Sequence, residues 1–160
     1  GEAPRRAGRL LLLDEVDLAN IACGGHAGDA GSMQWVVRKA LVRGVRTGAH
    51  PGWPDRQSFG RAATGVTPHR LAEELARQIG ALRRVLSQEG GVLSHVKLHG
   101  ALYHLCNEST ELAEACVDFM DAELEGCPLV CGAGSLLQAL GEARGVPLLR
   151  EIFADRAYAA

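Results

Sequence analysis

Three short polar segments of the 160-residue sequence each place a histidine close to glycine. The three histidines are His26, His50 and His99. An imidazole can transfer protons near neutral pH or coordinate a metal ion, and glycine allows a sharp turn and the close approach of a ligand. A single histidine of this kind often has only a structural role. The repetition of the pattern in three places predicts a shared site.

Two charged residues lie within or at the end of apolar, strand-like runs. Lys97 ends one run, and Glu151 lies inside another. A charge in such a position needs a partner or a substrate, so both residues are candidates for acid–base chemistry. A structural ion pair between the lysine and an acid is the alternative interpretation.

Other polar residues allow two interpretations each. Asp29 precedes a predicted helix, where it either caps that helix or holds His26 or a ligand. Asp55 either belongs to the site or fixes the turn around Pro54. The remaining histidines do not repeat the pattern, and we expect structural or surface positions for His69, His95 and His104.

Apolar runs and helical patterns alternate along the chain. Five strands are expected, at residues 16–22, 45–50, 92–98, 128–132 and 147–153. Four helices are expected between them: 68–89 after the cap Thr67, a stripe from Met33 to Leu41 that ends at Gly44, a stripe from Leu112 to Phe119 after Ser109, and about 135–144.

This alternation indicates an α/β fold with a parallel sheet, either open and doubly wound or part of a barrel. Polar residues follow at least four strands, which favours a barrel because a barrel brings all carboxyl ends of its strands to one mouth. A complete (β/α) barrel needs roughly 200 to 250 residues. We therefore expect residues 1–160 to be a single domain and a fragment of a larger barrel, with sequence missing on both sides.

Composition excludes several classes of protein. The formal net charge is -2 and only 4% of the residues are aromatic, which does not fit a nucleic-acid binder. The longest apolar run, at residues 10–13, is too short to span a membrane, and no signal peptide is recognised. Five scattered cysteines predict buried thiols in a reducing, cytoplasmic setting. No Walker loop is present, and the segment from Gly132 to Ser135 is either a plain turn or a phosphate-binding one.

The same polar segments resemble the LamB/YcsF family, which contains the A subunit of the bacterial ATP-dependent 5-oxoprolinase. The matching stretches, in the family's order, are NIACGGHAGD (20–29), GAHPGWPD (48–55), SFGR (58–61), QIGAL (78–82), HVKLHGALY (95–103) and EIFADRAY (151–158). The resemblance implies a (β/α) barrel of the glycoside hydrolase/deacetylase type. It also implies a hydrolase that, with B and C subunits, opens the lactam of 5-oxo-L-proline to L-glutamate while ATP is hydrolysed to ADP and phosphate.

The resemblance also implies roles for individual residues. Lys97 and His99 would activate the lactam or contact phosphate, and His26 and His50 would transfer protons. The residues that orient these groups would be Asp55, Glu151 and Asp155. The residues that hold the substrate would be Asn20, Asp29 and Arg156. This interpretation requires ATP as a co-substrate and assigns no metal ligands.

The sequence departs from the family pattern in several places. The acidic first strand of the family is reduced to Gly1-Glu2, Leu98 replaces a usual proline, Gly25 replaces an aromatic residue, and Ala62 replaces a second arginine. Two alternatives stay open at this point. The first is a metal-dependent hydrolase or deacetylase with His26, His50 and His99 around one divalent ion. The second is an inert fragment that binds only partner subunits, and an unpaired strand edge would also favour a homo-oligomer.

Overall fold

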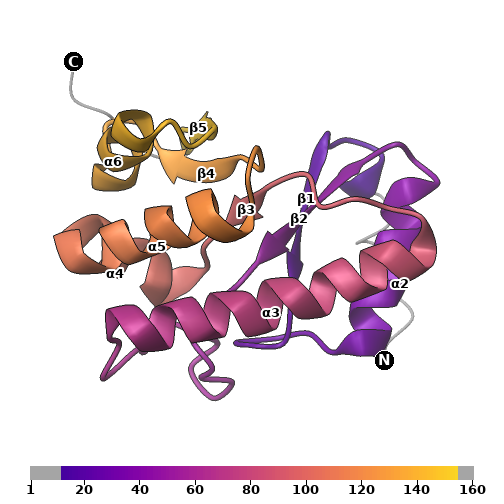
Figure 1. The fold of residues 1–160 in the computed structure, drawn as a ribbon. Helices are drawn as coiled ribbons and strands as arrows, with labels where there is room; N and C mark the ends of the chain where they lie inside the picture. The colour runs from indigo at the N-terminus through magenta and orange to yellow at the C-terminus, as the bar shows by residue number, and fades with distance from the viewer. Residues whose placement is uncertain (1–11, 155–160) are drawn as a thin grey trace.

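The structure is a computed structural model that describes residues 12–154. One parallel sheet contains five strands in chain order: β1 (Leu18–Ala22), β2 (Arg46–His50), β3 (Val96–Lys97), β4 (Leu129–Gly132) and β5 (Leu148–Glu151). A doubly wound sheet reverses its strand order at a switch point, and these strands show no reversal. The sheet therefore has the order of a (β/α) barrel wall, and within the described residues it stays open (Figure 1).

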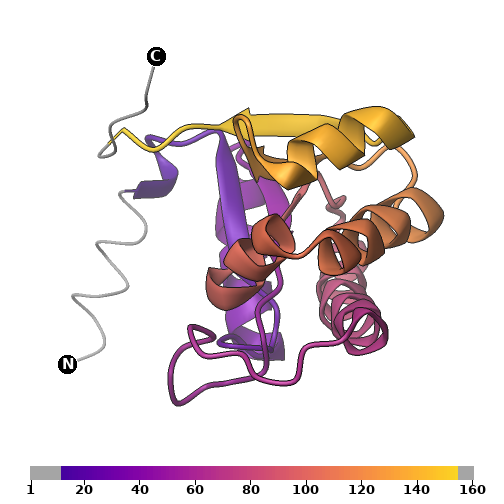
Figure 2. The ribbon, with the colours of Figure 1, turned by 90° about the vertical axis from the view of Figure 1, so that its left-hand side faces the viewer.

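The helices form a second layer along one face of this sheet (Figure 2). Helix α2 packs against α3, α3 against α5, and α5 against α6, while α4 contacts both α5 and α6. Their bounds are α2 (Ala30–Leu41), α3 (Pro68–Glu89), α4 (Gly100–Glu108), α5 (Thr110–Glu123) and α6 (Leu136–Arg144). Helices α2 to α6 leave the opposite face of the sheet uncovered (Figure 2).

Helix α3 shows how the sequence sets this layer. The hydroxyl of Thr67 accepts a hydrogen bond from the N–H of Arg70, Pro68 occupies the first turn, and Gly90 ends the helix in a left-handed conformation. The apolar stripe of α3 is buried, and it includes Leu71, Leu75, Ile79, Leu82 and Leu86. Each such leucine contributes roughly 1.5–3 kcal/mol by its burial.

The strand register sorts side chains onto the two faces. Ile21, Ala49, Val96 and Leu129 lie in one row of paired or equivalent positions, and all four are buried toward the helices. Because side chains alternate along a strand, the neighbouring positions face the side without helices. Asn20, Lys97 and Glu151 lie there, which leaves polar groups at the carboxyl ends of the strands on an uncovered face.

Two expectations about elements need correction. The strand expected at 92–98 is only Val96–Lys97, because the chain leaving α3 passes through solvent at Val92, which is 79% exposed, before it reaches the sheet. Helix α4 was not expected, since its first turn coincides with the polar segment around His99. The other strands begin one or two residues later than expected, and β5 ends at Glu151 rather than at residue 153.

The five cysteines are free thiols, and Cys23, Cys106, Cys116 and Cys131 are buried. Burial raises the pKa of Cys23 to about 12, so this thiol stays protonated and unreactive. The structure thus agrees with their interpretation as small apolar core residues. Among residues 12–154, no helix has both the length and the apolar character that crossing a membrane requires.

Candidate active site

The three histidines singled out in the sequence meet at the carboxyl edge of the sheet. His50 ends β2, His26 lies in the loop after β1, and His99 directly precedes α4. The rings of His26 and His99 stack with centroids 3.6 Å apart, and the ring of His50 meets that of His99 edge-on at 4.9 Å. The convergence expected from the sequence is therefore present.

Glycines make this close packing possible. A β-carbon at Gly52 would lie 2.3 Å from Nδ1 of His26, and one at Gly60 would lie 2.6 Å from its Cβ. The side chain of Gln78, buried in α3, accepts from the N–H of Gly52 at 3.1 Å and donates to its carbonyl at 2.8 Å. Gln78 thus fixes the loop that follows His50 against the helix layer.

The rings of His50 and His99 form a continuous line of polar contacts. Nδ1 of His50 lies 2.7 Å from the carbonyl oxygen of Lys97, and Nε2 of His50 lies 3.1 Å from Nδ1 of His99. Nε2 of His99 lies 2.8 Å from the carbonyl oxygen of Phe59. All four nitrogens of the two rings are therefore engaged within the protein.

Burial keeps two of these imidazoles neutral. Desolvation, helped by the nearby His99, His26 and Lys97, lowers the pKa of His50 to about 3, although the Lys97 carbonyl works in the opposite direction. Desolvation, followed by the charges of His99 and Arg56, lowers the pKa of His26 to about 4. At neutral pH both rings are uncharged and can accept a proton.

Lys97 and Glu151 form an ion pair between β3 and β5. Nζ of Lys97 lies 2.5 Å from Oε2 of Glu151, and about one fifth of each side chain is exposed. Oε1 of Glu151 is buried without a hydrogen-bond partner, and Nζ also lies 5.4 Å from the centre of the Phe153 ring. The ion-pair interpretation of the two strand-end charges is thus realised, next to a polar atom that can still accept a hydrogen bond.

A cavity of about 200 Å³ opens beside this pair. It is lined by His50, Lys97, Leu98, His99, Gly100, Tyr103, His104 and Phe153. A second hollow of about 280 Å³ lies on the uncovered face and includes Asn20, Lys97 and Glu151. Lys97 borders both spaces, while His26 packs behind His99 and lines neither.

Asn20 also contacts a histidine on the same face of the sheet. Its Oδ1 lies 2.9 Å from Nε2 of His95, and Nδ1 of His95 lies 2.7 Å from the hydroxyl of Ser94. Gly48 separates Asn20 from His95 in the sheet, and a β-carbon there would lie 2.2 Å from the His95 ring. Burial lowers the pKa of His95 to about 4, so it is the neutral, hydrogen-bonded structural residue expected.

The structure places the remaining predicted site residues at turns or leaves them undescribed. Asp29 caps α2, where its carboxylate accepts from the N–H of Ser32 at 2.8 Å. Asp55 accepts from the N–H of Ser58 at 3.1 Å, and its other oxygen, Oδ2, is buried without a partner. Asp155 and Arg156 lie outside the described residues.

The glycine turn before α6 uses its backbone amides internally. The N–H of Ala133 bonds to the Glu151 carbonyl, and the N–H of Gly134 bonds to the side chain of Gln138. The N–H of Ser135 bonds to the Gly132 carbonyl. Since a phosphate site at a helix N-terminus needs free amides, the plain-turn interpretation fits this segment.

The three imidazoles do not present their nitrogens to a common point. The ring nitrogens of His50 and His99 face each other or carbonyl oxygens, and Nδ1 of His26 lies against Gly52. Within residues 12–154, no group of three or more His, Cys, Asp and Glu side chains is arranged to hold a metal ion. The triad proposed for the metal-dependent alternative therefore lacks a ligand geometry here.

Sequence reasoning overlooked two residues of this region. Phe59 packs edge-on against the rings of His26 and His99, with centroids at 5.1 Å and 5.3 Å, and Gln78 clamps Gly52. Both belong to stretches used for the family resemblance, SFGR and QIGAL. A buried glutamine on an apolar helix stripe was the available signal for Gln78, but no local pattern marks Phe59.

Comparison with known proteins agrees with this fold and identifies the family. The structure resembles a crystal structure titled as a lactam utilization protein from Thermus thermophilus, with a TM-score of 0.89 and 39% sequence identity. The match covers 94% of this chain and 60% of that one, so the chain spans less than two thirds of its relative's length. The LamB/YcsF family model matches residues 9–160. The chain belongs to the LamB/YcsF family.

Proposed function

We propose that this chain is part of an ATP-dependent 5-oxoprolinase and contributes the site at which the lactam of 5-oxo-L-proline is opened to L-glutamate. The observation that carries this proposal is the meeting of His50, His99 and Lys97 at one small cavity in a chain of this family. The relative described as a lactam utilization protein points to the same class of cyclic amide.

The cavity suits a small cyclic substrate. Its volume of about 200 Å³ lies below the roughly 300–1,000 Å³ typical of sites for drug-sized ligands. The aromatic rings of Tyr103 and Phe153 provide apolar walls, and Lys97 provides a cation. A five-membered lactam with one carboxylate offers an apolar ring to these walls and a negative charge to the cation. A nucleotide is larger than this cavity.

The residues divide the chemistry between charge and proton transfer. An unstrained amide is a poor electrophile, so its oxygen must be activated, and phosphorylation by ATP supplies that activation. The ammonium of Lys97 would stabilise the negative charge of the phosphoryl group that this oxygen receives. The imidazoles of His50 and His99 would receive a proton from water and return it to the leaving nitrogen.

Glu151 would hold Lys97 in position through the ion pair of its Oε2 with Nζ. For Asp155 and Arg156, outside the described residues, orientation and substrate binding remain the proposed roles. Asn20, Asp29 and Asp55 would act indirectly, by fixing His95, α2 and the turn after β2.

ATP and the B and C subunits complete the proposed enzyme. The amides of the turn before α6 are occupied, so this turn does not support a phosphate site. We therefore propose that the nucleotide is bound largely outside residues 12–154, in the partner subunits or in further parts of this subunit. A homo-oligomer of this subunit is compatible with that arrangement.

The test is an assay of glutamate release from 5-oxoproline with ATP, using the full-length subunit together with its B and C partners. Wild-type complex should release glutamate and ADP in equal amounts, and Lys97→Ala should reduce turnover while the complex still assembles. Equal turnover in wild type and in both Lys97→Ala and His99→Ala would remove this site assignment. A stoichiometric metal that is lost in His50→Ala would favour the metal-dependent hydrolase instead.

A further inference from the structure

Phe59 has an unusual backbone conformation for its residue type. Its φ of 55° lies in the left-handed region, and no other residue except glycine has a positive φ between residues 12 and 154. A side chain with a β-carbon is disfavoured there, and the Phe59 side chain is 49% exposed, so burial compensates little. Strain of this kind persists where surrounding contacts impose it.

The contacts that impose it come from both ends of the turn. The N–H of Gly60 bonds to the Asp55 carbonyl at 2.6 Å, and the N–H of Ala101 bonds to the Gly60 carbonyl at 3.0 Å. A β-carbon at Gly60 would also strike His26. The turn is thus held between its own start and the first residues of α4, directly over the stacked histidines.

This conformation directs the Phe59 carbonyl at His99. A carbonyl oxygen only accepts hydrogen bonds, so the contact of 2.8 Å requires a proton on Nε2 of His99. The same reasoning applies to the other end of the pair, where the Lys97 carbonyl requires a proton on Nδ1 of His50. The two outer nitrogens of the pair therefore both carry protons.

The two inner nitrogens then face each other at 3.1 Å without a proton between them. Two neutral imidazoles carry two protons in total, and the three contacts of the pair require three. In the neutral pair, one of the contacts must set two lone pairs against each other. Addition of one proton between Nε2 of His50 and Nδ1 of His99 turns all three contacts into hydrogen bonds.

We propose that His50 and His99 act as a single proton-binding unit and that Phe59 is the positioning residue that fixes its tautomers through its backbone carbonyl. Proton uptake gives one shared imidazolium, and proton release restores the neutral pair. The catalytic use of this unit rests on the proposed function. Water would give its proton to the pair as hydroxide adds to the carbon of the phosphorylated lactam, and the pair would return that proton to nitrogen as the C–N bond breaks. A second water would then hydrolyse the acyl phosphate to the free carboxylate and phosphate.

The charges of Lys97 beside His50 and of Arg56 near His26 oppose protonation of the pair, as does His26 once it is charged, while Glu151 partly offsets the charge of Lys97. The other titratable groups that face the pair are Tyr103 and His104 on the cavity wall. Burial acts in the same direction. Because only the pair gains a hydrogen bond on protonation, we expect it to bind a proton at higher pH than His26.

The test is ¹⁵N NMR of the histidine rings in the wild-type protein, without substrate, ATP or partner subunits, as the pH is lowered from about 8 to about 4. We expect His99 protonated at Nε2 and His50 at Nδ1 throughout, and a shared proton on the inner nitrogens before His26 titrates. Protonation of His26 first, or His99 protonated only at Nδ1, would overturn the proposal. The measurement is independent of catalysis, so a failed assay of glutamate release leaves this result unaffected.

Matched variants assign the effect to the backbone of Phe59. Phe59→Gly removes the ring but accepts a positive φ, so the tautomers of His99 should be retained. Phe59→Val disfavours that φ and should shift His99 toward a mixture of tautomers. Phe59→Ala should lie between them and serves as the second variant where the valine protein is unstable. Identical spectra for the glycine variant and a folded valine or alanine variant would contradict the role given to Phe59.

Discussion

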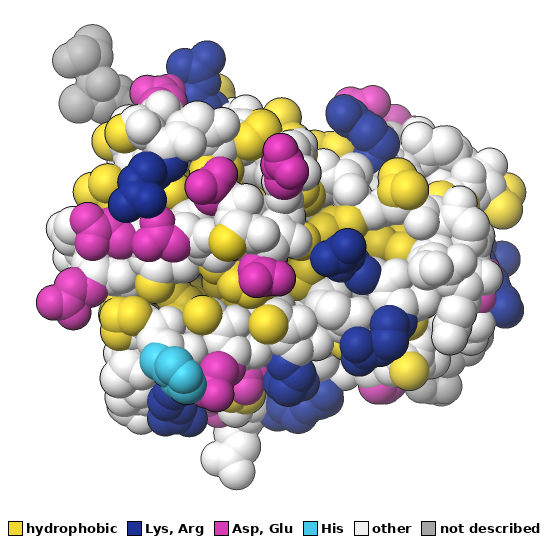
Figure 3. Space-filling model, in the orientation of Figure 1, with side chains coloured by type: hydrophobic (Ala, Val, Ile, Leu, Met, Phe, Trp, Pro, Cys, Tyr) yellow, Lys and Arg dark blue, Asp and Glu magenta, His cyan; other side chains and the backbone are white. Residues whose placement is uncertain are grey.

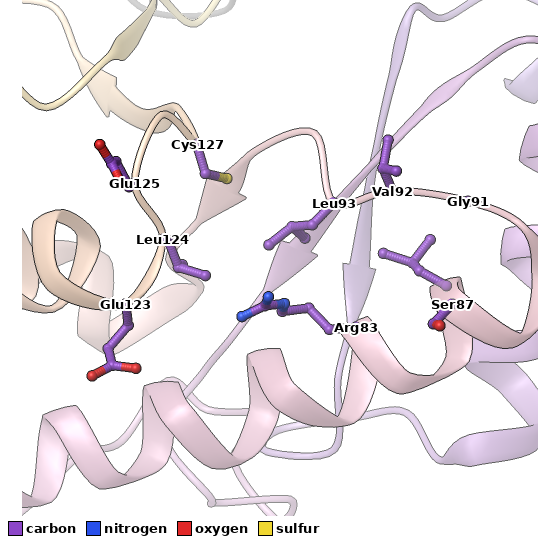
Figure 4. Close-up of a pocket in the computed structure, with 10 residues that line it drawn as sticks. Arg83, Ser87, Gly91, Val92, Leu93, Glu123, Leu124, Glu125 and Cys127 are labelled. Atoms are coloured by element: carbon purple, nitrogen blue, oxygen red, sulfur yellow. The ribbon is translucent and has the colours of Figure 1, made fainter.

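Two hollows lie at opposite ends of the same sheet, and the larger one carries the less reactive groups. The hollow at the amino ends of β3 and β4 has a volume of about 530 Å³ and lies between α3 and the end of α5 (Figure 4). Its walls include Leu86, Leu93, Leu124 and Cys127, and apolar side chains gather between the two helices on the surface (Figure 3). The cavity at the carboxyl ends has a volume of about 200 Å³.

The difference follows from the direction of the strands. In parallel (β/α) folds the loops after the strands carry the chemistry, and the opposite ends serve stability. Here the carboxyl-end cavity has three histidines and a lysine, whereas the charged groups at the other hollow, Arg83, Glu123 and Glu125, lie on its rim. Cavity size alone would select the end of the sheet opposite to the proposed site.

The largest expected effect is a difference in enzyme activity between variants at the two ends of the sheet. Lys97→Met should lower turnover of the assembled enzyme about 10³-fold, because it removes the cation proposed to face the negative charge of the phosphoryl group. Arg83→Met at the other hollow should leave turnover within a factor of about two. Glutamate release under saturating 5-oxoproline measures both. A comparable loss in the two variants would erase the functional difference between the hollows.

The second expected effect is a difference in folding stability between variants at the two ends of the sheet. Leu86 is 1% exposed and lines the larger hollow, so Leu86→Ala should lower the free energy of unfolding by about 3 kcal/mol through lost burial and a new cavity. His104→Gln, on the wall of the smaller cavity, should change it by less than about 1 kcal/mol. Urea unfolding followed by circular dichroism checks both values, and the reverse order would contradict the comparison.

The third effect concerns pH and should arise from the buried histidines, above all from His95 directly before β3. The folded protein holds His95 with a pKa of about 4, below its ordinary value of 6.5. The unfolded chain therefore binds more protons between these values, and stability falls as the pH decreases through this window. From pH 6.5 to about pH 5 this one group should cost about 2 kcal/mol.

The control for this pH effect is an exposed histidine. His95→Gln should reduce the pH dependence of unfolding, and His69→Gln, at the solvent-facing start of α3, should leave it unchanged. The lowered pKa values of His26 and His50 add to the same dependence. An unchanged slope in His95→Gln would mean that the other two histidines account for all of it.

The smallest effect tests the rim of the larger hollow. Val92 lines that hollow and is 79% exposed, so Val92→Thr should change the free energy of unfolding by no more than about 0.5 kcal/mol. A loss above about 1 kcal/mol, measured by urea unfolding, would show that this rim is part of the packed core.

Much of the fold could be predicted because local signals agree with the tertiary structure. The cap at Thr67, the first-turn Pro68 and the terminating Gly90 fixed both ends of α3 correctly. The segment before β3 failed because apolar residues do not reveal whether a strand partner is within reach, as exposed Val92 demonstrates. Helix α4 failed because its first residues were interpreted only as site residues.

The sequence predicted which histidines meet at the candidate site, but it did not predict the contacts between them and the surrounding backbone. Histidines after successive parallel strands must approach each other, so the meeting of His26, His50 and His99 followed from the strand pattern. The carbonyl of Phe59 reaches His99 across 40 residues of sequence. No periodicity or spacing encodes such a backbone contact, because it depends on how one turn folds over another.

Gly48 has a consequence for the whole sheet. Shifting β2 by one residue in either direction would bring Thr47 or Ala49 beneath the His95 ring, where even a methyl group does not fit. Because Gly48 has no side chain, the contact between Asn20 and His95 can pass over β2, and this contact fixes the register of β1, β2 and the start of β3. The same contact holds the two-residue strand β3 in register with β2. That register in turn sets the distance between His50 at the end of β2 and His99 after β3.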